Sequence, residues 1–67
     1  MPRWSNVTFK KEDTPAIDVF INEIIAIYHK HGMSISHEDG YGGFIIEDFS
    51  MQNVKWLNDA VINMKAR

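Results

Sequence analysis

The sequence has 67 residues, of which 45% are hydrophobic, with a formal net charge of −2 and no cysteine. This composition excludes disorder, disulfide or zinc-thiolate staples and thiol catalysis, and the scattered Lys and Arg residues argue against a duplex nucleic-acid binder. One domain of this size, residues 1–67, gains only about 3–5 kcal/mol from its own core, so we expect homo-oligomerisation to stabilise it.

The N-terminal segment, residues 1–13, is predicted to be an arm or a strand. Its residues alternate weakly through Val7 and Phe9, a pattern compatible with a third strand beside a hairpin or with a crossing to a neighbouring subunit. Basic residues in this segment, Arg3 among them, are interpreted as solvated.

The first helix is predicted over residues 15–31. Asp13 or Thr14 can cap it and Pro15 suits its first turn, while Gly32 provides a left-handed stop. Its apolar residues cover an arc of roughly 180°, wider than the roughly 100° stripe that packs on one surface. We therefore expect a homo-oligomer interface on this helix, formed by Val19, Phe20, Ile24, Ile25 and Ile27.

A β-hairpin is predicted over residues 33–49. If Asp39 and Gly40 form a two-residue turn, Ile35 pairs with Phe44 and Met33 pairs with Ile46. In that register one face carries Met33, Ile35, Phe44 and Ile46, and we expect this face to be the floor of the core. A longer loop that includes Gly42 and Gly43 would shift the register.

The second helix is predicted over residues 50–65, with Ser50 as its N-cap. The expected fold class is therefore α+β, in the order helix, β-hairpin, helix, with a small single-layer sheet covered by the helices. In an alternative arrangement the N-terminal arm adds a further strand to this sheet. Neither a linker nor an internal repeat divides the chain.

Residues that often bind ligands are concentrated at the hairpin turn. An imidazole, carboxylates, a phenol and bare backbone lie within eight residues, and such groups are typical of binding loops. The candidate ligand-binding residues are Ser36, His37, Glu38, Asp39, Tyr41, Gly42 and Gly43. In the alternative interpretation the glycines only serve the turn and the acids are solvated.

Metal and catalytic chemistry are disfavoured by spacing. His29 and His31 point about 200° apart on a helix, and neighbouring strand residues such as Ser36 and His37 face opposite sides of a sheet. We expect no metal, no cofactor and no catalytic residue, and hence a protein that is not an enzyme. A small hydrolase with a site between subunits is the alternative.

The hairpin motif resembles a group of short, mostly uncharacterised proteins of tailed bacteriophages. The resemblance rests on residues 34–39, Ser-Ile-Ser-His-Glu-Asp, on Phe44-Ile45-Ile46-Glu47 after the glycine turn, and on Trp56-Leu57. It covers about residues 29–60 and implies a phage setting, with the cytoplasm of an infected bacterial host as the location. No segment approaches the roughly 18 apolar residues that span a bilayer, so no membrane partner is expected.

The leading hypothesis is a non-enzymatic, oligomeric binding protein that captures a small polar ligand, such as a nucleotide signal, in a counter-defence role. Tyr41 would stack on the ligand, His37 would contact a phosphate, and Gly42 and Gly43 would allow close approach. Glu38 and Asp39 count against an anionic ligand. The alternative is a protein–protein inhibitor or adaptor that covers a host protein with its helix surfaces, including Met51, Trp56 and Ile62. In that alternative the turn is structural or is itself the contacting loop.

Overall fold

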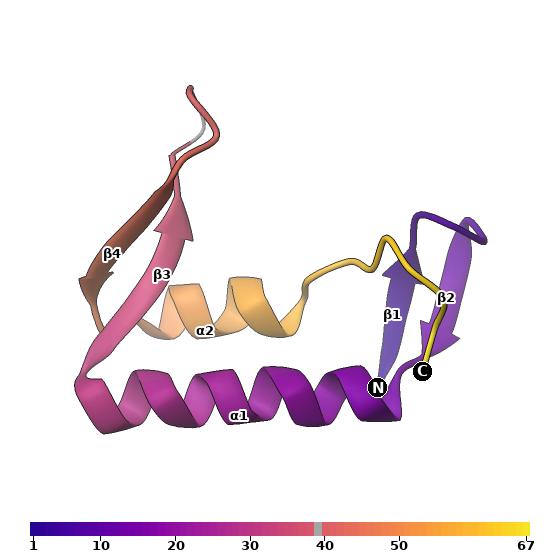
Figure 1. Cartoon of the computed structure of the whole chain (residues 1–67), viewed down its shortest axis with the longest axis horizontal. Coiled ribbons are helices and arrows are strands. Elements are labelled where there is room, and N and C mark those ends of the chain that lie inside the picture. Colours follow the sequence, from indigo (N-terminus) through magenta and orange to yellow (C-terminus); the bar gives the residue numbers. More distant parts are fainter. Residues whose placement is uncertain (39) are drawn as a thin grey trace.

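The computed structural model describes residues 1–38 and 40–67, which form two helices and two antiparallel sheets of two strands each (Figure 1). The elements follow the chain as β1 (Pro2–Ser5), β2 (Lys10–Asp13), α1 (Pro15–His31), β3 (Met33–His37), β4 (Phe44–Asp48) and α2 (Met51–Asn58). The mixed α+β class is confirmed. The order differs from helix, hairpin, helix because the N-terminal arm folds into a hairpin of its own.

The elements lie side by side in a thin, open arrangement. Helix α1 forms a long base with α2 beside it, and the two hairpins rise from opposite ends of α1 (Figure 1). The Cα extents are 34 × 28 × 15 Å and the radius of gyration is 12.8 Å, against about 11 Å for a compact chain of this length. The elements therefore form about one layer, whereas stable domains usually pack two layers of elements against each other.

Helix α1 spans the predicted range, Pro15–His31. Gly32 ends it in the left-handed conformation, at φ 67°, and its N–H donates to the Tyr28 carbonyl. Thr14 occupies the N-cap position, but its side chain makes no capping hydrogen bond. Its hydroxyl is instead committed to Arg3 and Asp18, so the prediction of a side-chain cap is wrong.

The register predicted from a two-residue turn in the second hairpin is wrong by two residues. The structure pairs His37 with Phe44, Ile35 with Ile46 and Met33 with Asp48, which matches the longer-loop alternative. Within the loop, the Glu38 N–H donates to the Gly43 carbonyl at 2.8 Å, and the Gly42 N–H returns to the Glu38 carbonyl at 3.1 Å. Gly42 adopts a φ of 70°, a conformation that glycine reaches without strain.

The face of this hairpin expected to form the floor of the core is exposed. A shift of two residues preserves the two faces, yet Phe44 is 82% exposed and Ile46 is 64% exposed. The opposite, polar face packs on α2: Asn53 Nδ2 donates to Ser34 Oγ at 2.8 Å and to Glu47 Oε2 at 2.7 Å. Asn53 and Ser34 are each 1% exposed, so a buried polar network orients the hairpin.

Helix α2 ends at Asn58 and not near residue 65 as predicted. Ser50 caps its start by accepting from the Asn53 N–H, as the sequence predicts. Beyond Asp59 the chain becomes extended and joins the outer edge of β1, where Ile62 N donates to the Trp4 carbonyl at 2.9 Å and Asn6 N donates to the Ile62 carbonyl at 2.8 Å. These bonds satisfy backbone groups that a longer helix would have used internally.

The N-terminal arm forms a hairpin at the far end of α1 and does not extend the β3–β4 sheet. Strands β1 and β2 pair Pro2 with Asp13 and Ser5 with Lys10. The Ser5 hydroxyl accepts from the backbone of Val7 and Thr8 and thereby stabilises the turn.

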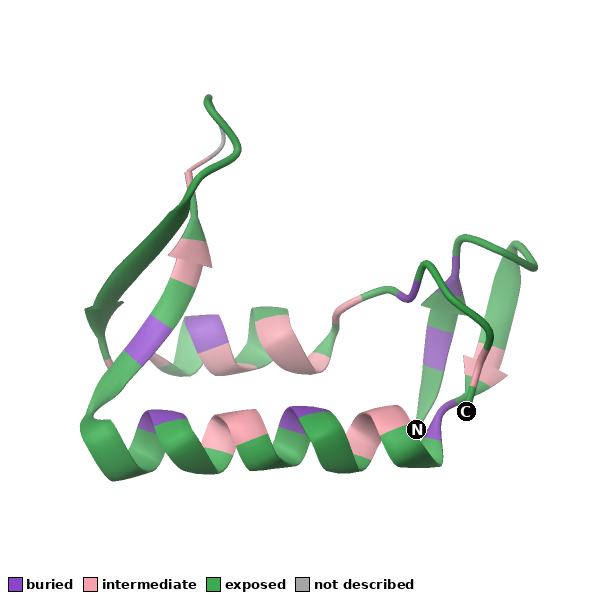
Figure 2. Cartoon of the chain, viewed as in Figure 1, coloured by how far each residue is buried: buried purple, intermediate pink, exposed green. Residues whose placement is uncertain are grey.

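The apolar core is small. Among the described residues, the buried apolar side chains are Ile21, Tyr28 and Ile62, and on α1 the buried positions lie along the side that faces α2 (Figure 2). Much of the apolar content predicted to form a core lies on the surface instead.

Candidate functional site

The turn between β3 and β4 projects from the rest of the molecule (Figure 1). The Glu38 carboxylate folds back over it and accepts hydrogen bonds from the backbone N–H groups of Gly40, at 2.8 Å, and Tyr41. Together with the two backbone bonds between Glu38 and the glycines, these contacts close the loop on itself. These hydrogen bonds fix the conformation of the turn.

The predicted ligand-binding residues separate into different environments. Tyr41 is 96% exposed at the tip, while Ser36 is half-buried on the polar face of β3. His37 is exposed, opposite Phe44, with its ring 6.4 Å from the Trp56 ring. Gly42 and Gly43 lie in the loop, and Asp39 lies outside the described residues.

The chemistry of this turn disfavours a phosphate. Successive backbone N–H groups in a turn can hold an anion, but the N–H groups of Gly40 and Tyr41 already hold the Glu38 carboxylate. To bind these N–H groups, an anionic ligand would have to displace the carboxylate of Glu38, which belongs to the same loop. In addition, the whole segment 33–48 contains neither Lys nor Arg.

Metal-binding geometry is not found in residues 1–38 and 40–67, where no group of three or more His, Cys, Asp or Glu side chains could share an ion. His29 instead packs against Phe49, with ring centroids 4.6 Å apart. This contact joins the last turn of α1 to the segment that enters α2.

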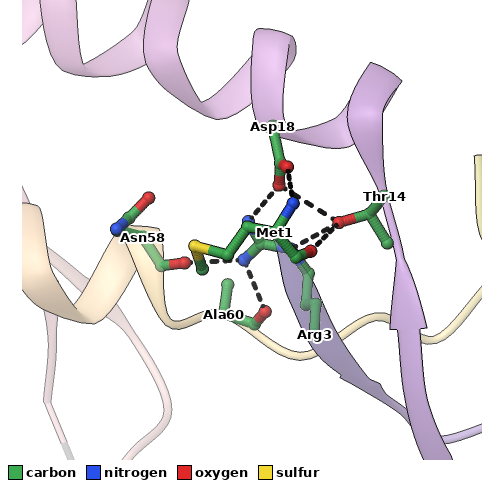
Figure 3. Close-up of polar contacts among 6 residues, drawn as sticks. All are labelled: Met1, Arg3, Thr14, Asp18, Asn58 and Ala60. Carbon is green, nitrogen blue, oxygen red and sulfur yellow. Dashed lines mark hydrogen bonds and ion pairs between the residues drawn. The ribbon is translucent and has the colours of Figure 1, made fainter.

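A polar cluster centred on Arg3 joins the N-terminal strand and the end of α2 to α1 (Figure 3). The guanidinium donates from Nη1 to the carbonyls of Asn58, at 2.7 Å, and Ala60, at 2.9 Å, and from Nη2 to Asp18 Oδ1 at 2.7 Å. Arg3 is 3% exposed, so its interpretation as a solvated residue is wrong. It caps the carbonyl of Asn58, the last residue of α2, which has no partner within the helix, and it binds the carbonyl of Ala60 just beyond the helix.

Asp18 is the anionic centre of the same cluster. The Met1 α-ammonium group, 2.6 Å from Oδ2, and the Arg3 guanidinium lower the pKa of Asp18 to about 2. The Thr14 hydroxyl contributes a further hydrogen bond at 3.1 Å. This cluster is not predictable from a local pattern because its members are far apart in the chain. Arg3 and Ser5 share the buried face of β1, which only the folded structure shows.

A broad apolar surface runs along α1 and onto the exposed side of the β3–β4 hairpin. We call this surface the apolar face and define it by Phe20, Ile24, Ile27, Met33, Ile35 and Ile46. Two hollows border α1: one of about 490 Å³ lies between α1 and the segment that follows α2, and one of about 420 Å³ lies between α1 and the β3–β4 hairpin. Phe20 lines the first, and Ile24 and Ile27 line the second.

The five residues predicted to form an oligomer interface do not share one face. Phe20, Ile24 and Ile27 belong to the apolar face, and Phe20 and Ile27 are 62% and 55% exposed. Val19 is 57% exposed but lies about 140° around the helix from Ile24, at 100° per residue. Ile25 is half-buried on the other flank.

Comparison of the chain with protein families, with curated proteins and with solved structures found no match. Neither helix in the described part of the chain is long and apolar enough to cross a membrane. The turn and the apolar face are therefore the features of this chain that bear on its function.

Proposed function

We propose that this protein is a non-enzymatic binding protein that acts by protein–protein contact, with the β3–β4 turn as its contacting loop. The observation that carries the proposal is the exposure of two aromatic side chains, 96% for Tyr41 in this closed turn and 82% for Phe44 at the start of β4. Aromatic residues on a pre-organised loop are typical anchors of protein interfaces, because they bury a large area at a small cost in side-chain entropy.

Charge indicates the kind of partner. The hairpin carries Glu38, Asp39, Glu47 and Asp48 and has no Lys or Arg between residues 33 and 48. A complementary partner is a protein with an apolar pocket for Tyr41 and a rim of Lys or Arg side chains. Association with such a surface is expected to slow as ionic strength rises.

Protein contact is favoured over nucleotide capture by the position of Glu38. Its carboxylate occupies the loop N–H groups that a phosphate would use, and the hairpin has no permanent cation to replace them. The bacteriophage setting and the counter-defence role stay predictions from the hairpin motif; in that setting the partner would be a host defence protein.

The test uses Tyr41→Ala and Phe44→Ala, with Phe9→Ala as the matched control. Phe9 is 74% exposed in the turn of the other hairpin, so all three variants remove an exposed aromatic ring and leave the core unchanged. In affinity capture from a lysate of the native host, a partner protein should be retained by the wild type and by Phe9→Ala and lost by both hairpin variants.

The same proteins are titrated with ATP, cyclic AMP and a cyclic dinucleotide by isothermal titration calorimetry. Nucleotide binding that disappears in Tyr41→Ala would contradict the proposal and favour ligand capture. Equal partner retention by all three variants would show that the turn is not the contacting loop.

A further inference from the structure

Helix α1 exposes a stripe with the spacing of a coiled-coil seam. Phe20, Ile24, Ile27 and His31 follow one another at intervals of four, three and four residues, the alternation of heptad positions a and d. Phe20 lines the first hollow, and the other three line the second. The centre of the stripe lies about 80° around the helix from the buried residues Ile21 and Tyr28. The stripe therefore borders the side of α1 that packs within the chain, and Ile24, which is half-buried, lies on that border.

The surface area of the chain is too large for a compact monomer. Its solvent-accessible surface is 5071 Å², whereas a compact chain of its mass exposes roughly 4,400 Å². The excess, about 700 Å², is close to the roughly 800 Å² that each partner buries in a standard protein interface. The 15 Å thickness of the molecule gives the same indication, because one further layer would complete a two-layer domain.

Charges beside the stripe specify the orientation of a second copy. Glu23 and Lys30 are exposed, lie seven residues apart on the same flank, and make no ion pair within residues 1–38 and 40–67. About 10 Å of helix separates them, which is too far for a contact within one chain. In an antiparallel helix pair, the same flank of each helix lies on one side of the interface. A residue on that flank can therefore face the residue that lies seven positions away on the same flank of the partner helix.

We infer that two copies of this chain form a two-fold symmetric dimer in which α1 packs antiparallel against the partner's α1. Ile24 lies against the partner's Ile27, and Phe20 against the partner's His31. Glu23 then faces the partner's Lys30, and the two-fold axis repeats each contact. A parallel pair would bring Glu23 and Lys30 to the opposite flank of the partner helix, where neither meets its complement.

This dimer leaves the tip of the proposed contacting loop open, whereas Phe44 shares the hairpin face of Ile35 and Ile46. The hairpin turn projects away from α1 (Figure 1), so Tyr41 stays free to contact another protein. The dimer would cover the apolar face, supplying the second layer that the single chain lacks.

The first test compares Ile27→Asp with Val19→Asp by sedimentation equilibrium over a range of concentrations. The two wild-type side chains are 55% and 57% exposed on the same helix, so the variants differ mainly in the face they alter. Ile27→Asp is expected to weaken the dimer by roughly 100-fold, as removal of a central interface residue does, while Val19→Asp remains dimeric. A monomeric wild type, or an equal effect of both variants, overturns the proposal.

The second test is specific to the orientation. Glu23→Lys replaces two attractive pairs by two repulsive ones and should raise the dimer dissociation constant about tenfold at low salt. Adding Lys30→Glu restores opposite charges across an antiparallel interface, so the double variant should return to within a few-fold of the wild type. Failure of the double variant to recover overturns the antiparallel pairing, and circular dichroism confirms that each variant is folded.

Discussion

Asn53 on α2 donates a hydrogen bond to Ser34 on β3 at 2.8 Å, and both residues are 99% buried, each with 1% of its surface exposed. This contact turns the polar side of the second hairpin inward. Because successive strand residues alternate between faces, it also turns Met33, Ile35 and Ile46 outward. One buried amide therefore accounts for the outward position of the hairpin residues of the apolar face.

Replacement of Asn53 tests that relationship. Asn53→Ala leaves the Ser34 hydroxyl without its donor and removes the contact to Glu47, at an expected cost of about 1–3 kcal/mol in the free energy of unfolding. The neighbouring variant Gln52→Ala, at an exposed position of the same helix, should change it by less than about 0.5 kcal/mol. Urea unfolding measures both; equal midpoints in the two variants would contradict the role of Asn53.

Arg3→Met removes the residue that joins the N-terminal hairpin, α1 and the end of α2. The carbonyls of Asn58 and Ala60 lose their donor and Asp18 loses a buried cation, so we expect a loss of about 3 kcal/mol. Lys11→Met, on the exposed strand β2, is the matched control. A similar urea midpoint for both variants would mean that the cluster contributes little to stability.

The pH dependence of stability should depend on Asp18. Its folded-state pKa is lowered to about 2 by the Met1 ammonium group and Arg3, so its contribution is complete above the ordinary pKa of about 4 and is lost as pH falls towards 2. In Asp18→Asn this part of the acid destabilisation should be absent. Thermal unfolding from pH 6 to pH 2 compares the two, and parallel curves would contradict the assignment.

How far the sequence predicts the structure depends on whether the decisive contacts are local. Helix α1 was predictable because its apolar period, its first-turn Pro15 and its Gly32 stop all lie within one segment. The hairpin register was not, since it depends on the Glu38 side chain binding the loop backbone. The preference of the Asp39-Gly40 dipeptide for a two-residue turn takes no account of this contact.

The burial of the hairpin faces was also unpredictable from local pattern. Apolar periodicity predicts that Ile35 and Ile46 face the core. The face that is buried is instead determined by Asn53, a residue of the later helix α2, which binds the polar face of the hairpin. For the same reason Arg3 was misinterpreted: its partners Asp18, Asn58 and Ala60 come from three separate parts of the chain.

The two turn glycines 32 and 43 form a matched pair for testing backbone strain. Gly32 has a φ of 67° and open space around its Cα, whereas Gly43 has similar space without a positive φ. Gly32→Ala should therefore lower the free energy of unfolding by about 1 kcal/mol, and Gly43→Ala should leave it unchanged or raise it slightly. Thermal unfolding of the two variants measures the difference, and equal destabilisation would contradict the conformational explanation.

The central claim is that this chain works as a dimer that binds another protein and holds no small ligand. Native mass spectrometry of the protein, purified gently from the cells that express it, tests this most directly because it reports subunit number and bound small molecules together. We expect a species that contains two chains and carries no small-molecule mass. A single chain, or an assembly carrying a nucleotide-sized mass, would contradict the account.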